Sequence, residues 1–147
     1  MKVKTLALLA VCTLLLLASH ANAASKVDKA GKVIEIREKM FVAQTDDIYV
    51  NMKDYVGSTV RYEGIFATFP SFTPGEEGPR MVYRKSPGCC GFDGISGFQV
   101  AWDGSYPDPN AWVKVEGVLE PAGDGMLLVR LSSLEVMEKR GREFVTQ

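Results

Sequence analysis

Histidine is almost absent from this sequence of 147 residues, and the single one, His20, stands just after an N-terminal apolar run. The run, Leu6 to Ala18, follows two lysines and precedes the small residues of Ala21–Ala23. That order is typical of a secretory signal, and the run is too short to span a membrane comfortably, so we predict cleavage of residues 1–23. The mature chain would then lack histidine. Mechanisms that need a histidine base are excluded, and we expect a protein that is not an enzyme.

A strong excess of positive charge and a second long apolar run are also missing. The chain has 17 basic and 18 acidic residues, and loss of the signal would remove two lysines and no acid. A mildly acidic chain is poorly suited to nucleic acid, whose phosphates must be neutralised by Lys and Arg. We therefore expect an extracytoplasmic protein, periplasmic or secreted, that binds no nucleic acid and has no membrane span in its mature form.

The residues after the signal are enough for one domain with a single core. Residues 24–32 are small, polar and charged and predict a flexible leader, so the domain is expected at residues 33–147. Alternating apolar and polar residues predict strands in most of it, while residues 46–55 fit a short helical turn or an irregular segment. The expected strands are Val33–Ile36, Met40–Ala43, Thr59–Phe69, Met81–Arg84, Phe98–Trp102, Trp112–Glu120 and Met126–Val136.

Two of the expected strands carry a glycine in their interior, Gly64 and Gly117. A glycine inside a strand often marks a bulge or a bend, which a small closed barrel needs at its corners. Five or six short strands and no long helix predict a mainly β fold, a small closed or partly open OB-like barrel. A β-sandwich is the main alternative, because a count of strands does not separate the two folds.

Cysteine is scarce as well: of three residues, Cys12 lies in the predicted signal, and Cys89 and Cys90 are adjacent. Neighbouring Cα atoms lie about 3.8 Å apart, less than the roughly 4.4–6.8 Å of an ordinary disulfide, so a bond between these two sulfurs would be strained and easily reduced. The flanking Gly88 and Gly91 allow unusual backbone dihedrals there. The pair could form this vicinal disulfide, stay as two thiols, bridge two chains, or bind a soft metal as thiolates.

Asp93 follows the cysteine pair closely and could add a carboxylate to two thiolates. Cys89, Cys90 and Asp93 are therefore the candidate metal ligands, with zinc as the leading ion and Asp103 or Asp108 as a further ligand. Simpler interpretations stay open: the cysteines could be small buried residues, or a disulfide that pins a turn capped by Asp93. A thiol redox role is a third possibility.

Aromatic residues cluster on or beside the expected strands, and OB barrels often bind ligands on an aromatic strand face. Tyr62 and Phe98 alternate with polar neighbours as core residues should. Trp112, which lies on the opposite face of its strand from Val113, and Trp102 are the candidates for a ligand-stacking face.

One set of motifs points to a known family: Asn51, Asp54–Gly57, Glu63–Gly64, Cys89–Cys90 with Asp93, Gly97–Val100 and Trp112–Gly117. Through them most of the mature chain resembles uncharacterised bacterial exported or membrane-anchored proteins with a C-terminal OB-like domain. In some members the domain follows membrane helices and is encoded beside a predicted permease. The resemblance thus implies a role in handling metals or small solutes, with an envelope permease or another protein as partner. This chain departs from that pattern because it lacks the membrane helices.

Together these observations predict an extracytoplasmic, non-enzymatic binding module that holds a soft metal, with zinc favoured, through its Cys-Cys segment. The alternatives are a thiol/disulfide redox protein that uses the vicinal pair, and a purely structural or interaction domain.

Overall fold

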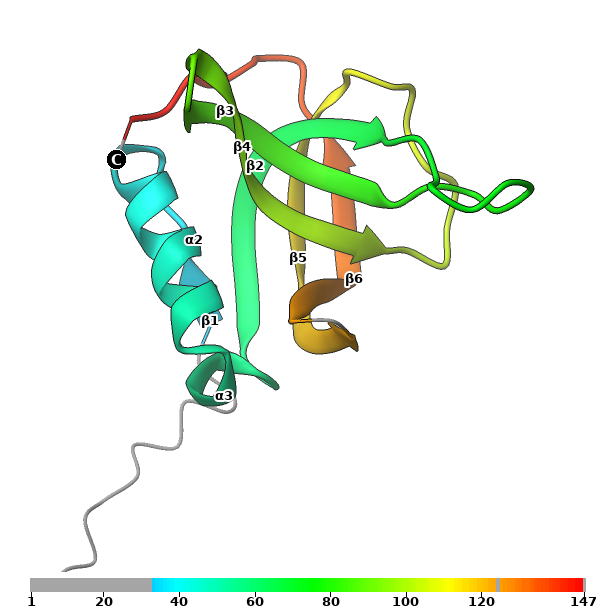
Figure 1. The fold of residues 1–147 in the computed structure, drawn as a ribbon, viewed down its shortest axis with the longest axis horizontal. Coiled ribbons are helices and arrows are strands. Elements are labelled where there is room, and N and C mark those ends of the chain that lie inside the picture. The colour runs from blue at the N-terminus through cyan, green and yellow to red at the C-terminus, as the bar shows by residue number, and fades with distance from the viewer. Residues whose placement is uncertain (1–32, 124, 147) are drawn as a thin grey trace, which may run out of the picture.

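The computed structural model describes residues 33–123 and 125–146 (Figure 1). The predicted signal and leader lie outside the described residues. The prediction of a mainly β protein is confirmed, because strands dominate the described chain and belong to one mixed sheet. These strands are β1 (Val33–Glu35), β2 (Thr59–Thr68), β3 (Arg80–Gly88), β4 (Gly91–Ala101), β5 (Trp112–Gly123) and β6 (Met126–Val136).

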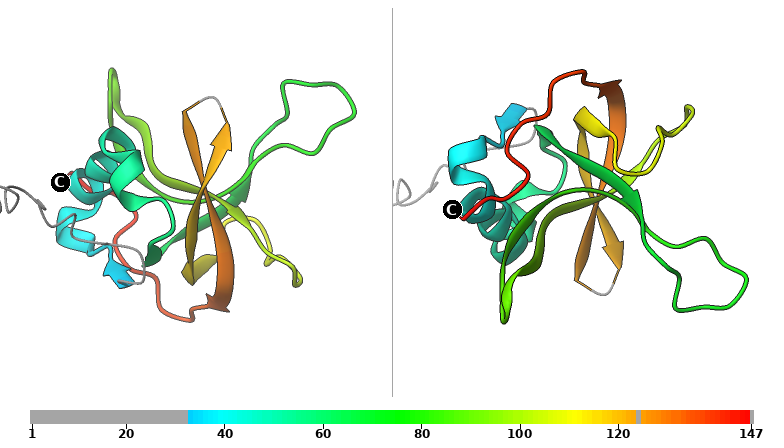
Figure 2. Two further views of the ribbon diagram at one scale, coloured as in Figure 1. Left: turned by 90° about the horizontal axis from the view of Figure 1, so that it is seen from below. Right: turned by 90° about the horizontal axis from the view of Figure 1, so that it is seen from above.

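Five of the strands close into a ring. The neighbour order β2–β3–β4–β6–β5 returns to β2 through direct pairing of β2 with β5. Within the ring β4 and β6 run parallel and the other pairs antiparallel, while β1 adds to β2 as a parallel strand outside it. Figure 2 shows the β5–β6 hairpin crossing the sheet formed by β2, β3 and β4. One continuous ring of hydrogen bonds is the arrangement expected of an OB-like fold, and it differs from the two separate sheets of a sandwich.

Gly64 and Gly117 occupy close backbone approaches in this ring. After Gly64 strand β2 gains a second partner: Gly64 pairs with Val113 of β5, and Ile65 pairs both with Trp112 of β5 and with Tyr83 of β3. A Cβ atom at position 64 would lie 2.7 Å from the carbonyl oxygen of Tyr83, and one at position 117 would lie 2.3 Å from that of Arg130. Because backbone atoms would have to shift to relieve such contacts, both positions favour glycine.

The chain between β1 and β2 is helical, which corrects one prediction. The sequence predicts a strand at residues 40–43, but Met40 ends a 3-10 turn, η1 (Glu38–Met40), and the helices α2 (Phe41–Val50) and α3 (Met52–Tyr55) follow. The pattern misleads because a run of four apolar residues does not distinguish a strand from a helix. The buried residues of α2 show the helical spacing of four and three: Phe41, Thr45 and Ile48.

Helix α2 packs on the ring through both aromatic and hydroxyl side chains. The ring of Tyr49 stacks on that of Phe98 in β4, with 5.3 Å between the centroids. Thr45 Oγ1 and Ser96 Oγ lie 2.6 Å apart in a buried hydrogen bond. These contacts fix the helix against β4. Neither helix approaches the length and apolar character of a membrane span, and no other helix within the described residues does.

The tail after β6 folds back onto β3. Strand β2 pairs with β3 only as far as Tyr83, so the edge of β3 beyond that residue is open to a new partner. The backbone N–H of Lys85 donates to the carbonyl of Glu143, and the carbonyl of Lys85 accepts from the N–H of Val145. Val145 is buried in the core. Residues 143–145 are termed the C-terminal strap below.

Candidate metal site

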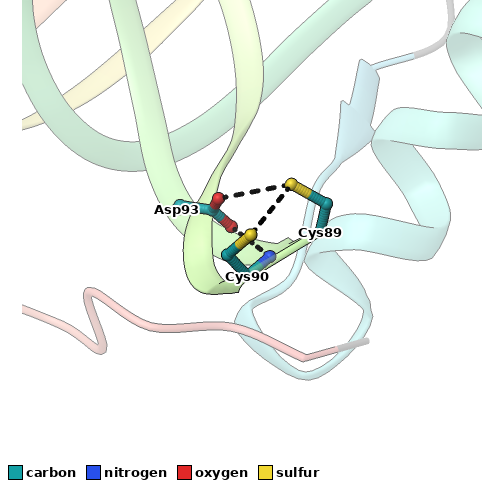
Figure 3. A group of neighbouring side chains, drawn as sticks. All are labelled: Cys89, Cys90 and Asp93. Atoms are coloured by element: carbon teal, nitrogen blue, oxygen red, sulfur yellow. Dashed lines mark hydrogen bonds between the residues drawn. The ribbon is translucent and has the colours of Figure 1, made fainter.

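The cysteine pair forms the tip of the β3–β4 hairpin (Figure 3). Gly88 at the end of β3 pairs with Gly91 at the start of β4, so Cys89 and Cys90 are the two residues of the turn. Gly91 has a φ of +117°, a conformation that residues with side chains rarely adopt. Both thiols are free and exposed.

Three potential ligand atoms converge at this tip. The two Sγ atoms lie 3.4 Å apart, and Cys89 Sγ lies 3.7 Å from Asp93 Oδ2. The backbone N–H of Cys90 donates to Asp93 Oδ1 at 3.4 Å, which orients the carboxylate toward the turn. The three ligand atoms are all within 4.8 Å of one another, and no other group of three such side chains occurs in the described part of the chain. Asp103 and Asp108, the further ligands suggested by the sequence, do not join it.

These separations resemble the edges of a tetrahedral metal site. Zinc binds thiolate sulfur at about 2.3 Å and carboxylate oxygen at about 2.0–2.2 Å, so tetrahedral angles imply edges of about 3.8 Å between sulfurs and about 3.5–3.7 Å between sulfur and oxygen. The observed 3.4 Å and 3.7 Å differ from these by a few tenths of an ångström. The third edge, between Cys90 Sγ and the Asp93 carboxylate, is at most 4.8 Å, so side-chain rotations that bring it to the length of the others would let the three residues hold a zinc-sized ion. Because all three residues are exposed, a fourth position would face outward.

Gly88 leaves the space that the Asp93 carboxylate occupies. A Cβ atom at this position would lie 2.1 Å from Asp93 Oδ1 and 2.8 Å from the backbone nitrogen of Gly94. Any residue with a side chain would thus displace the Asp93 carboxylate and crowd the backbone at Gly94. The sequence indicates only a backbone role for Gly88, since its steric role depends on the pairing across the hairpin.

An exposed aromatic pair stands beside the tip. Phe92 of β4 and Phe144 of the C-terminal strap meet edge to face with 5.4 Å between ring centroids, and they are 51% and 46% exposed. Lys85 Nζ lies 4.9 Å from the Phe144 ring centroid and 3.5 Å from the carboxylate of Glu143. Phe144 is missed by the sequence analysis because it is distant from the cysteines along the chain. Its only signal is an aromatic residue next to a valine in a charged tail.

Trp112 has no free ring face, which corrects the expectation of a stacking surface there. Its side chain is buried, and its Nε1–H donates to the Glu63 carboxylate at 3.2 Å. The guanidinium carbons of Arg84 and Arg140 lie 4.9 Å and 5.5 Å from the ring. Arg140 also donates to the backbone carbonyl of Asn110, which holds the tail over the indole. The alternation along β5 places Trp112 outward correctly, but the folded tail covers that side.

Arg84, which contacts the Trp112 ring, is a buried cation. Arg84 is 3% exposed, and its guanidinium donates to the carbonyls of Glu63 and Arg142 and to the carboxylate of Glu38. Burial lowers the pKa of Arg84, and the Glu38 carboxylate opposes that shift. The pKa of Glu38 is lowered in turn, first by the backbone N–H of Arg142 and then by Arg84. This network holds η1 and the tail together, and we interpret it as structural.

Trp102 lies far from the cysteines along the same strand. It follows Ala101 at the end of β4, whereas the cysteine pair precedes the start of β4. Trp102 is half-buried and packs against the core, and its backbone N–H donates to the hydroxyl of Tyr106 at 2.7 Å. The structure therefore does not bring the tryptophans and the cysteines into one site.

A hollow of about 460 Å³ opens elsewhere, between β1, η1 and the two helices. Its lining holds no thiol and one carboxylate. The Gln44 amide there accepts a hydrogen bond from the backbone N–H of Arg37 and donates one to the carbonyl of Glu35. The candidate metal site is instead a projecting turn, which suits an ion held by ligand bonds but not a ligand that must be enclosed. The residues that line the hollow are Val33, Ile34, Glu35, Arg37, Met40, Gln44 and Tyr55.

Comparison with known proteins identifies a family for this chain. Among curated proteins none is similar enough to count as a match. A family model described as the DUF1980 C-terminal domain matches residues 17–142, a range that includes all six strands and the hairpin tip. Because this match covers most of its length, the chain belongs to the DUF1980 C-terminal domain family.

Proposed function

We propose that this domain is an extracytoplasmic, non-enzymatic module that binds one soft metal ion, zinc first, through Cys89, Cys90 and Asp93. The observation that carries the proposal is the convergence of two thiols and a carboxylate within 4.8 Å on one exposed turn. Thiolates favour soft and borderline ions, and a carboxylate as third ligand suits zinc better than copper(I). Location outside the cytoplasm is supported by the signal-like residues 1–23, and a mature N-terminus at Ala24 in the intact mass would test it.

The exposure of the site suits an ion that binds reversibly. All three side chains are exposed, and the core of the ring is complete without them. A metal at this turn would not be required for folding, unlike the metal of a zinc finger. Because the ligands bind in their deprotonated forms, metal affinity should fall as the solution becomes more acidic.

The test is a titration of the reduced, metal-free protein with zinc against a chromophoric chelator. We expect one zinc per chain when zinc is in excess, complete loss of stoichiometric binding in Cys89→Ser or Cys90→Ser, and at least about tenfold weaker binding in Asp93→Asn. Gly88→Ala keeps all three ligands but displaces the carboxylate, so it should weaken binding about as much as Asp93→Asn does.

Asp103→Asn is the matched control, because it removes an exposed carboxylate at the other end of β4 and should leave affinity unchanged. Wild-type protein that retains no zinc in competition with the chelator would refute the proposal. Equal affinity in the wild type and the two cysteine variants would refute it as well.

The adjacency and exposure of the two thiols also favour a second candidate, a dithiol–disulfide cycle. In that reaction the pair would lose two electrons and two protons to a small-molecule disulfide, which is thereby reduced to two thiols. Asp93 gains and loses no electrons in this exchange. Either cysteine variant should abolish it, whereas Asp93→Asn should leave it in place.

A further inference from the structure

The candidate site supplies fewer ligands than a closed zinc site needs. Structural zinc is almost always bound by four protein ligands, most often cysteines and histidines. The hairpin tip offers two thiolates and one carboxylate, and no other His, Cys, Asp or Glu in the described residues joins that group. The ligands best suited to complete the shell are two more thiolates, and another copy of this same hairpin carries them.

We propose that a second copy of this chain completes the site when metal is scarce, so that two β3–β4 hairpins share one ion through four thiolates. The inference rests on the proposed metal-binding function. Cys89 and Cys90 of each chain would form one edge of the tetrahedron, and the same residues of the partner copy would form the opposite edge. Asp93 would then orient the turn through the Cys90 N–H, as it does in the single chain.

The geometry of a tetrahedron allows this arrangement with exact two-fold symmetry. A two-fold axis through the metal exchanges two opposite edges, so each Cys89 maps onto the other Cys89 and each Cys90 onto the other Cys90. The resulting contact uses the same surface on both chains, which is the usual form of a closed homodimer. The sulfur–sulfur distance of 3.4 Å already lies close to the roughly 3.8 Å edge of a zinc–thiolate tetrahedron.

The surroundings of the tip permit such an approach. The hairpin projects from the body of the domain in both views of Figure 2, so two tips can meet before the domains collide. Phe92 and Phe144 stand exposed beside it and would gain cover in the pair. Lys85 contacts the Phe144 ring and the carboxylate of Glu143, which Arg140 also binds.

The shared ion should depend on the ratio of metal to protein. Below half an equivalent of zinc, thiolates are in excess and four of them can bind each ion. Above one equivalent, each hairpin has an ion of its own, and the two-thiolate, one-carboxylate site described above takes over. The dimer should therefore reach a maximum near half an equivalent and disappear as zinc is added further.

Native mass spectrometry and light scattering during a zinc titration of the reduced protein test this directly. We expect a dimer with one zinc at half an equivalent and a monomer with one zinc in excess metal. Cobalt(II) gives an independent readout, because its sulfur-to-metal charge-transfer absorption per ion should be about twice as strong in the four-thiolate dimer as in the two-thiolate monomer.

Three variants separate the possible outcomes. Asp93→Asn should keep the dimer at half an equivalent while weakening the one-to-one complex, Phe92→Lys should weaken the dimer and spare the one-to-one complex, and Cys90→Ser should lose both. A protein that binds zinc one-to-one at every ratio without dimerising would overturn the shared site and leave the proposed function intact. That result would mean that water or a different protein completes the shell. Absence of zinc binding at any ratio would overturn both proposals.

Discussion

Replacement of Glu38 by Gln tests the network that joins the N-terminal turn to the C-terminal tail. Glu38 Oε2 accepts from Arg84 Nη1 at 3.1 Å and from the backbone N–H of Arg142 at 3.0 Å. Glutamine has nearly the same shape and keeps an acceptor oxygen, so Glu38→Gln removes the charge and little else. The Arg84 guanidinium, whose side chain is 4% exposed, would then lose the carboxylate that balances it.

The expected cost follows from the two hydrogen bonds. A hydrogen bond to a charged group contributes about 1.5–3 kcal/mol and a neutral one about 0.5–1.5 kcal/mol, so the loss of charge should cost about 1 kcal/mol per bond. The side chain of Glu38 is 40% exposed, and solvent screening reduces its share of that sum. We expect the free energy of unfolding to fall by about 1–2 kcal/mol, which corresponds to a decrease in Tm of about 5 °C for a domain of this size.

The pH dependence supplies a second, independent signature. The pKa of Glu38 is lowered from its ordinary value of 4.5 in the folded protein, so the stability it contributes is present above pH 4.5 and is lost as the pH falls through the folded-state pKa. Urea denaturation of wild type and Glu38→Gln should show a constant difference from pH 6 to 8. That difference should shrink below about pH 4.5, because the carboxyl is then protonated first in the unfolded chain and, at its lowered pKa, also in the folded protein.

Glu77→Gln is the matched control, because Glu77 also pairs with an arginine, Arg80, but its side chain is 78% exposed. It should change the free energy of unfolding by less than about 0.5 kcal/mol. Equal stability of Glu38→Gln and wild type at pH 7 would refute the reasoning. So would a difference that persists unchanged at pH 3.

Two further predictions concern the ring and the strap. Gly117→Ala should lower the free energy of unfolding, measured by urea denaturation, by about 2 kcal/mol or more, because its Cβ would lie 2.3 Å from the Arg130 carbonyl oxygen. An unchanged free energy would mean that the strand can shift freely. Val145→Ala should lower the free energy of unfolding by about 2 kcal/mol because Val145 is buried in the core. The neighbouring Thr146 is exposed, so Thr146→Ala should leave it nearly unchanged, and equal effects of the two changes would show that the strap does not pack as described.

The alternation of apolar and polar residues made most of the sheet predictable. Thr59 to Phe69 and Trp112 to Glu120 alternate clearly, and each corresponds to a strand within a few residues of the expected bounds. The glycines at positions 64 and 117 predicted a bulge or a bend, and the pairing of β5 with β6 does shift register at Gly117. These features are local, so they can be recognised in the sequence before any partner strand is known.

What the sequence hid were contacts between distant segments. The helix at Phe41–Val50 resembles a strand at its start, and its face becomes apparent only when Tyr49 and Thr45 meet β4. The residues after β6 are rich in charge and give no local sign of a contact with the ring, yet Val145 is buried in the core. The burial of Trp112 could not be predicted for the same reason: its strand face is as expected, but Arg140 of that tail covers the ring.

The grouping of the three candidate ligands could be predicted because they are neighbours in sequence. A turn of two residues closes the hairpin, so Cys89, Cys90 and Asp93 are bound to lie close together whatever the rest of the chain does. The same locality separates the site from the core: the ring would retain its buried side chains if both thiols were replaced. A site attached to the fold in this way can change its ligands at little cost in stability. Loss of metal binding in the cysteine variants can therefore be assigned to the ligands and not to unfolding.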